Sequence, residues 1–270
     1  MRIGRAKEVN VPVTALGKSG DLPVWPPLLA TNGPGGRSAG HKHHAMHFIA
    51  CRKGRLRVRV GRGAFSEPTP AILTAPDVEH AVNATGAEVL LVFIEPESLV
   101  GAALRKVLHE PVRLFSPTEC AQLDLEIEPS ALLGPEGVAW TRRLVAAVGG
   151  DEWPLPPMHP RVRKLLSLLR ERPQARDSSL EALAAEVGLS PSRLMHAFTS
   201  SIGVPLRPYL AWLRVQRAAA ALVTGAPLAS CALDAGFADA AHMTRTFRRM
   251  LGVAPSELRP SAAASGRARS

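Results

Sequence analysis

Four histidines in the N-terminal half have the spacing to coordinate a metal ion or to line a ligand pocket. His41, His43 and His47 fall close together, and His80 follows further along the chain. On an extended strand the first three share one face, because side chains alternate, whereas His44 points the other way. Imidazole nitrogens bind Zn, Ni, Cu or Fe ions. Three possibilities follow: three or four of these imidazoles bind a metal ion, or His43, His47 and His80 line a small-molecule pocket, or the histidines lie at a strand end without metal.

Short strands broken by Gly and Pro must position these histidines. The segment Arg55–Val60 alternates strictly, which places Leu56, Val58 and Val60 on one buried face and three arginines on the other. Antiparallel strands spaced about ten residues apart predict a small sandwich or barrel over residues 1–96. Further strands are predicted at residues 47–51, 71–74 and 87–94.

The pattern changes to a helical period over residues 97–149. Residues 97–108 and 136–148 each place aliphatic side chains on one stripe, with acidic residues first and basic residues later, as the helix dipole favours. These helices either cover their own barrel or pair across a homodimer. The Pro-rich stretch at 150–160 is then typical of a linker between domains.

The C-terminal part contains an internal repeat. The stretch Gly188–Phe198 followed by Gly203 corresponds to Gly236–Phe247 followed by Gly252, with a period of 48 to 49 residues. Cys231 occupies the place of an apolar residue in the other copy, so we expect it in the core.

Each copy has the pattern of a helix-turn-helix unit. A short apolar helix ends at a Gly, and Ser190 or Asp239 then caps a second helix. The stretch Tyr209–Val223, preceded by two prolines, predicts a long helix between the units, about 25 Å in length.

The net positive charge of the chain lies mostly in its C-terminal part. Residues 1–158 contain 17 Lys and Arg against 16 Asp and Glu, whereas residues 159–270 contain 16 against 7. Such a basic excess is typical of a module that binds phosphates. No apolar run spans a bilayer, and the start of the chain lacks an apolar signal core, so we expect no membrane and a cytoplasmic protein.

The residues from Ala232 to Arg259 resemble the signature of the AraC-type family of bacterial transcription regulators nearly position for position. The resemblance covers roughly 100 residues and implies two helix-turn-helix units joined by a long helix over residues 161–260, followed by a disordered tail at 261–270. It also implies a sensory domain that is similar to a cupin barrel. The expected fold class is therefore α+β, with a cupin-like antiparallel β-barrel, a helical appendage and an all-α C-terminal domain.

The N-terminal residues are similar to the two cupin motifs. The first motif is matched at His41, His43, His47 and Gly54, and a looser second motif is matched at Pro76, His80 and Asn83. His47 replaces the usual acidic residue, and the second motif is one residue short in both spacings. Sensory cupins of this family commonly bind organic effectors, so the expected cofactor is none, with a metal ion as the alternative.

The family's geometry implies which side chains approach DNA. Two recognition helices joined by a rigid rod would enter successive major grooves about 34 Å apart. Arg193 and Arg245 are the candidates for bidentate contacts to guanine, and Arg248 and Arg249 are placed for phosphates. The remaining groove-facing candidates are Ser192, Met195, His196, Ala241, His242 and Thr244.

These patterns predict a sequence-specific DNA-binding transcription regulator that is not an enzyme. Its expected partners are double-stranded DNA and a small-molecule effector, with RNA polymerase and a second copy of the chain as further candidates. The alternative is a metal-dependent cupin enzyme fused to a DNA-binding module.

Overall fold

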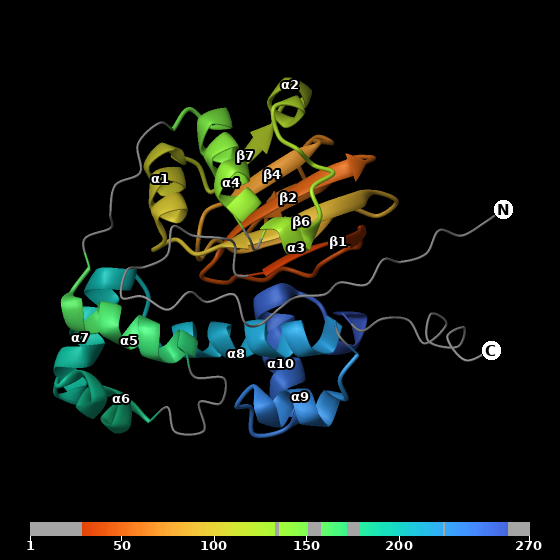
Figure 1. Cartoon of the computed structure of the whole chain (residues 1–270). Helices are drawn as coiled ribbons and strands as arrows, with labels where there is room; N and C mark the ends of the chain where they lie inside the picture. The colour runs from red at the N-terminus through yellow and green to blue at the C-terminus, as the bar shows by residue number, and fades with distance from the viewer. Residues whose placement is uncertain (1–28, 133–134, 151–157, 172–178, 224, 259–270) are drawn as a thin grey trace.

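The computed structural model describes residues 29–132, 135–150, 158–171, 179–223 and 225–258. The predicted tail at 261–270 and most of the predicted linker at 150–160 lie outside these residues. The described chain is α+β, with β-sheets in its N-terminal part and helices in its C-terminal part (Figure 1).

The N-terminal domain is built on two antiparallel sheets. A five-stranded sheet has the strand order β1-β6-β2-β4-β7, and β3 pairs with β5 in a second, two-stranded sheet. The strands are β1 Leu29–Pro34, β2 Met46–Lys53, β3 Arg57–Val60, β4 Ala71–Thr74, β5 His80–Asn83, β6 Glu88–Ile94 and β7 Val112–Phe115.

The two faces of the larger sheet bury different cores. Side chains of β2 and β4 alternate, so Phe48 and Leu73 face one side while Ile49 and Ile72 face the other. The first side is covered by α1 (Leu99–Val107) and α4 (Pro135–Ala147), and the second packs against the smaller sheet. The two long helices therefore cover their own domain. Two shorter helices, α2 (Pro117–Ala121) and α3 (Pro129–Leu132), complete the domain.

Three sequence expectations for this domain were wrong in detail. The segment 97–149 is not purely helical, because β7 lies within it and pairs with β4. His41 and His43 precede β2 instead of lying on a strand with His47, although His41 forms an isolated bridge to His80. Val60 is 40% exposed, because the buried face of the alternating segment ends at Val58.

The C-terminal domain consists of helices and one 3-10 turn. The helix α8 runs beneath the sheet domain, with two smaller helical groups at its ends (Figure 1). The elements are α5 Pro160–Glu171, α6 Leu180–Val187, α7 Pro191–Ile202, α8 Leu206–Val223, α9 Leu228–Asp234, α10 Ala240–Leu251 and η1 Pro255–Leu258.

The predicted caps of the second helix in each unit are confirmed. The Ser190 hydroxyl accepts from the backbone N–H of Arg193, and the Asp239 carboxylate accepts from that of His242. Gly188 ends α6 at φ 67°, a left-handed conformation that Gly adopts without steric cost. At about 1.5 Å per residue, the 18 residues of α8 extend about 27 Å.

Each helix-turn-helix unit has its own core, placed by the same repeat positions. Leu194 and Phe198 are fully buried in the first unit, and Met243 and Phe247 in the second. The predicted core position of Cys231 is also confirmed, because it is buried among the residues of the second unit. Among the described residues, no helix combines the length and apolar character needed to cross a membrane.

Candidate DNA-binding surface and histidine cluster

The helices α7 and α10 present the residues that were expected to contact DNA. Arg193 on α7 and Arg245 on α10 are exposed, whereas the core side of each helix is buried. Arg248 and Arg249 are also exposed, in the last turn of α10. The exposed remainder of the predicted set comprises Ser192, Met195, His196 and Ala241.

Two predicted contact residues on α10 are half-buried and interact with their own helix-turn-helix unit. The Thr244 hydroxyl donates to the carbonyl of Ala240 at 2.8 Å. The His242 ring lies edge-on to Phe237, with ring centroids 5.3 Å apart. Both side chains are therefore more restrained than Arg245.

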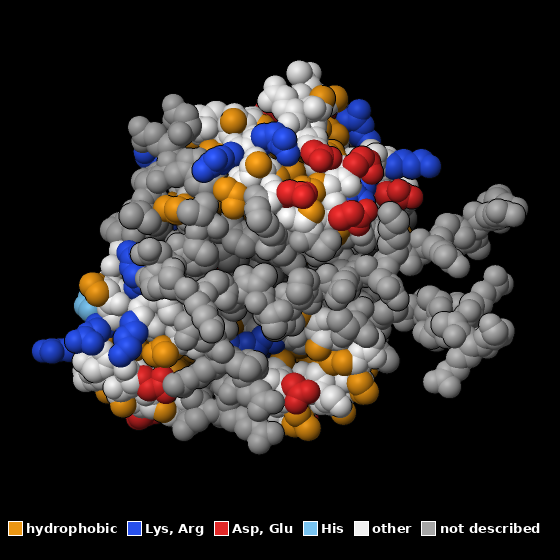
Figure 2. All heavy atoms as spheres, viewed as in Figure 1, with side chains coloured by type: hydrophobic (Ala, Val, Ile, Leu, Met, Phe, Trp, Pro, Cys, Tyr) orange, Lys and Arg blue, Asp and Glu red, His pale blue; other side chains and the backbone are white. Residues whose placement is uncertain are grey.

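On the face shown in Figure 2, Lys and Arg side chains gather at the end of the helical domain formed by α5, α6 and α7, whereas basic and acidic side chains are mixed over the N-terminal domain. This distribution agrees with the charge asymmetry of the sequence. A basic surface on one end of a domain attracts the phosphate backbone.

The four histidines converge at one end of the space between the two sheets. His41, His43, His47 and His80 are all buried, and each offers one ring nitrogen within 4.8 Å of the others. His47 projects from β2, and His80 from the start of β5. His47 Nδ1 lies 3.3 Å from His80 Nε2.

Backbone carbonyls fix the orientation of three of these rings. The Nδ1 atoms of His41, His43 and His80 lie 2.8–2.9 Å from the carbonyl oxygens of nearby residues. Because a carbonyl only accepts, Nδ1 carries the proton in each ring and Nε2 keeps its lone pair. The Nε2 atoms of His43 and His47 are buried, and neither has a hydrogen-bond partner among the described residues.

Burial keeps these imidazoles neutral. Loss of hydration is the largest cause that lowers the pKa of each histidine in the cluster, and it lowers that of His41 to about 4 together with repulsion from His80. For His43 and His47 the positive charge of neighbouring imidazoles lowers the pKa further. Neutral imidazole is the form that binds metal ions.

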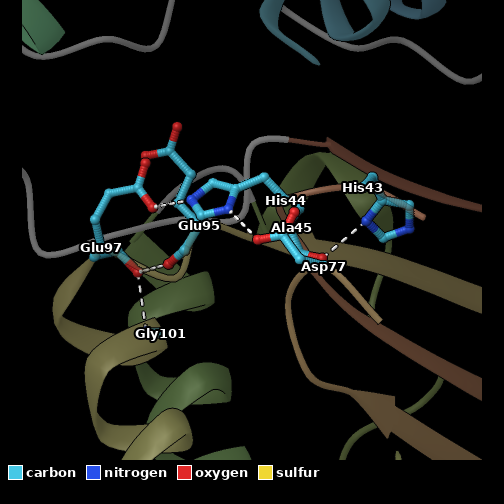
Figure 3. A network of polar contacts seen from close by, with 8 residues as sticks. His43, His44, Ala45, Asp77, Glu95, Glu97 and Gly101 are labelled. Carbon is cyan, nitrogen blue, oxygen red and sulfur yellow. Dashed lines mark hydrogen bonds and ion pairs between the residues drawn. The ribbon is translucent and has the colours of Figure 1, made fainter. Parts of the chain in front are cut away.

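His44 points away from His43 and belongs to a different network (Figure 3). Its Nδ1 lies 2.9 Å from Asp77 Oδ2, and its Nε2 lies 3.2 Å from Oε2 of the buried Glu97. Burial acts to lower the pKa of His44, but the hydrogen bonds to the two carboxylates outweigh it and raise the pKa to about 9. At pH 7 both ring nitrogens therefore donate.

The helical domain covers the histidine cluster. Trp212, in the middle of α8, stacks on His43 with ring centroids 5.1 Å apart. Phe93 stacks on His47 at 4.6 Å and also contacts Trp212. Since Phe93 and Ala45 are buried together with the core of the second helix-turn-helix unit, the two domains share one hydrophobic cluster here.

A second contact joins the end of α10 to the loop before the cluster. The backbone N–H of Ala39 donates to the carbonyl of Gly252, the C-cap of α10, at 3.1 Å. A Cβ at Gly252 would stand 2.7 Å from His41 Nδ1 and 2.6 Å from the Ala39 oxygen. Any other residue at this position would therefore push against the loop that holds His41.

An open cleft of about 500 Å³ lies beside this contact. Both domains line it, with Arg37 and Arg59 from the N-terminal domain and Glu257 from η1. It also reaches Ala39, whose carbonyl orients His41. The cleft thus lies beside the backbone segment whose carbonyl orients His41.

Sequence reasoning missed the residues that join the two domains. Trp212 lies among apolar residues of the helix that was predicted to join the two units, and Gly252 was noted only as part of the internal repeat. A long-range contact between Gly252 and residue 39 leaves no periodic signal. Sequence reasoning also missed the contact of Glu97 with His44, because an acidic residue near a helix start is usually explained by the helix dipole.

Two helix-turn-helix units joined by one long helix, each with an exposed arginine on its second helix, define a DNA-binding domain. Residues 183–261 match the protein family described as a helix-turn-helix domain. The arabinose operon regulatory protein of Escherichia coli (strain K12) is 32% identical over 108 residues, which cover 38% of this chain and 36% of that protein. The protein of the same name from Salmonella typhimurium is 32% identical over 108 residues, covering 38% and 37%.

The match spans little more than a third of the length of these relatives. The C-terminal domain is therefore similar to that of the arabinose operon regulatory proteins, in agreement with its AraC-like signature residues. The likeness of the N-terminal domain to a cupin stays a prediction.

The fold of most of the chain is similar to that of ToxT from Vibrio cholerae. An apo structure of a ToxT variant has a TM-score of 0.56 and 13% identity, covering 85% of this chain and 95% of that chain. Wild-type ToxT with a bound unsaturated fatty acid has a TM-score of 0.55 and 13% identity, covering 85% and 93%. At this identity the likeness concerns the fold alone.

Proposed function

We propose that this chain is a sequence-specific DNA-binding transcription regulator whose N-terminal domain binds a small effector. The observation that carries the proposal is the pair of helices held at the two ends of α8, α7 with the exposed Arg193 and α10 with the exposed Arg245, Arg248 and Arg249. A rod of about 27 Å brings two such helices close to the spacing of successive major grooves on one face of DNA. One chain would then bind two adjacent sub-sites.

The proposed contacts are of two kinds: base contacts, which give specificity, and phosphate contacts, which give affinity. Arg193 and Arg245 are exposed on the outer faces of α7 and α10, and a guanidinium matches the O6 and N7 atoms of guanine. Arg248 and Arg249 stand at the end of α10, where they suit phosphates. The second unit would contribute more of the backbone affinity, because the equivalent turn of α7 contains Thr199, Ser200 and Ser201.

The effector proposal is supported by the position of the candidate site. His43, His47 and His80 are buried directly beneath α8, and the neighbouring cleft is lined by both domains. A ligand at this junction contacts groups that the helical domain also contacts, which is what coupling between two sites requires. The ToxT structures with a fatty acid or with (E)-4-(8-methylnaphthalen-1-yl)but-3-enoic acid bound are examples of small-molecule binding in a similar fold.

Selection of binding sites from random duplexes by the full-length chain tests the proposal. We expect enrichment of a two-part site whose halves are centred about one helical turn apart. Arg193→Ala should lose the preference in one half and Arg245→Ala in the other, whereas Arg143→Ala, an exposed position on α4, should keep both. Absence of any enriched sequence would contradict sequence-specific binding.

A metal-dependent enzyme fused to a DNA-binding module is the second candidate, because the histidine cluster has the composition of a metal site. Turnover of a substrate by metal-loaded protein would favour it over a purely sensory role. A homodimer and a contact with RNA polymerase stay predictions, and cross-linking of the DNA-bound chain would test both.

A further inference from the structure

The histidine cluster has more nitrogen lone pairs than hydrogen-bond donors. Three rings direct their Nδ1 protons to backbone carbonyls, so their Nε2 atoms carry lone pairs, and that of His80 accepts from His47 Nδ1 at 3.3 Å. His47 can supply one N–H in its neutral form, yet its Nε2 has no partner among the described residues. Unpaired buried polar atoms are costly, and a cation at the centre would satisfy several at once.

Another buried polar group without a partner stands beside the rings. Thr74 is opposite His47 in the β2–β4 register, fully buried, and its hydroxyl has no hydrogen-bond partner in the described part of the chain. The Nε2 atoms of His43 and His47 are in the same situation, and these residues are only 3% and 5% exposed. The region between the two sheets around these histidines therefore contains unpaired polar groups, as a binding site does and a closed apolar core does not.

The geometry fits a metal ion. Nitrogen ligands lie about 2.0–2.1 Å from Zn²⁺, which places tetrahedral ligand atoms about 3.4 Å apart. The 3.3 Å between His47 Nδ1 and His80 Nε2 already has this value, and the remaining separations are at most 4.8 Å. Small ring movements would close the site. The carbonyls of Ala39, Ala45 and Val78 act as the outer partners that hold ligating imidazoles in one tautomer.

The ligand set narrows the choice of ion. Four neutral imidazoles without a carboxylate or a thiolate suit late first-row divalent ions, and they do not suit Mg²⁺ or Ca²⁺, which bind oxygen ligands. The carboxylates of Asp77 and Glu97 hydrogen-bond to His44 in a separate network.

We propose that His41, His43, His47 and His80 bind one late first-row divalent metal ion, and that the bound ion fixes the contact between the two domains. The inference rests on the proposed function, since it names the ligand of the effector site. Two of the ligands contact the helical domain directly: His43 stacks on Trp212 of α8, and His41 stands against Gly252 at the end of α10. Immobilising these rings immobilises the surfaces on which α8 and α10 rest.

The ion should tighten DNA binding. Arg193 and Arg245 remain exposed while the domains are in contact, so the docked arrangement leaves both recognition helices accessible. Holding α8 and α10 in one orientation reduces the ordering that DNA binding must impose. Coupling between sites is reciprocal, so DNA should also raise the affinity for the ion.

The first experiment measures metal binding by the full-length chain after treatment with a chelator. Zn²⁺ titrated against a chromogenic chelator should give one ion per chain, and Co²⁺ should give the visible absorption of a four-coordinate nitrogen site. His43→Ala/His47→Ala should lose this binding, whereas His109→Ala, which removes an exposed histidine, should keep it. Less than one ion per chain, or unchanged binding by the double variant, overturns the site. The Co²⁺ spectrum of the unmodified chain decides the question if the double variant does not fold.

The second experiment uses two equivalent glycines of the repeat. Gly252→Ala adds a methyl group against His41 and Ala39, whereas Gly203→Ala adds one at a C-cap of similar backbone conformation with nothing within 4 Å. We expect Gly252→Ala to weaken Zn²⁺ binding about fivefold or more, and Gly203→Ala to leave it unchanged. Equal effects of both substitutions would overturn the link between the metal site and the helical domain.

The third measurement separates this inference from the proposed function. Zn²⁺ should lower the dissociation constant of the full-length chain for its selected duplex about fivefold or more, and it should have no effect on His43→Ala/His47→Ala. Equal DNA affinity with and without Zn²⁺ would overturn the metal inference and leave the DNA-binding function intact. Failure to bind any duplex specifically, in either state, would overturn the proposed function itself.

Discussion

At the scale of single residues, Arg245 and the pair Arg248 and Arg249 make different contributions to the proposed DNA binding. All three are exposed on α10, but Arg245 lies within the helix and the pair lies in its last turn. A base contact discriminates between sequences, whereas a phosphate contact strengthens binding to all of them. This difference gives each residue a distinct signature in binding data.

Arg245→Ala should cost about 1–3 kcal/mol of binding free energy on the selected site and relax the preference at one base pair. Arg248→Ala and Arg249→Ala should weaken binding to every sequence alike. Competition against duplexes with single-base changes measures both effects. If Arg245→Ala weakens all duplexes equally, Arg245 contacts phosphate and its assignment to the groove is wrong.

His44 is a second residue whose role can be isolated, because it connects a buried carboxylate to an exposed one. Glu97 is 2% exposed and Asp77 is 46% exposed. His44→Ala should lower the free energy of unfolding by roughly 1–3 kcal/mol, since Glu97 loses a charged hydrogen-bond partner. Urea unfolding of the full chain measures the change.

Asp77→Asn is the matched control for His44→Ala. Asn tolerates the left-handed backbone at residue 77, where φ is 60°, and this side chain is half-exposed to water. Its effect should be smaller than that of His44→Ala. A larger effect would place the stabilising interaction at the exposed carboxylate instead of at Glu97.

At the scale of elements, both recognition helices depend on one polar cap each. Ser190 and Asp239 satisfy backbone N–H groups that have no partner within the helix. Ser190→Ala and Asp239→Ala should each destabilise the helical domain by about 1 kcal/mol in urea unfolding. Ser200→Ala, at an exposed position inside α7, should have little effect. An equal loss of unfolding free energy in Ser200→Ala would show that the two capping hydrogen bonds do not account for the destabilisation.

The elements of the helical domain could be predicted because their signals are local. Caps, left-handed glycines and buried positions such as Leu194 and Met243 follow directly from the repeat. The strand β7 escaped prediction because its four residues, Val112–Phe115, are too few for a clear alternation and lie between helical segments. The location of His43 before β2 was not predicted either, because the alternation of side chains that was used to place it assumes a regular strand.

The candidate sites were predictable to different degrees. The DNA-facing residues rest on the helix period and on family resemblance, and the structure adds their exposure. The histidines were identified by type and spacing, yet their arrangement around Trp212 depends on contacts between segments more than 100 residues apart. Such contacts are decided by tertiary packing, which a single sequence does not show.

At the scale of the whole molecule, the uneven charge predicts a strong dependence of DNA binding on salt. Each phosphate that the chain neutralises contributes about −0.9 to the slope of log affinity against log salt concentration. Arg248→Ala/Arg249→Ala should therefore reduce the slope of the full-length chain by about 2, whereas Arg143→Ala should leave it unchanged. Affinity that does not vary with salt would contradict binding through the basic helical domain.

The two units at the ends of α8 have different sequences, with Arg193 and His196 on one recognition helix and His242 and Arg245 on the other. A single chain therefore has no two-fold axis to match a palindrome, and the duplex that it binds has a direction. Inverting such a site would turn the N-terminal domain toward the opposite flank of the DNA. In the proposed function, the order of the two units along α8 would thus determine on which side of the DNA site the N-terminal domain lies.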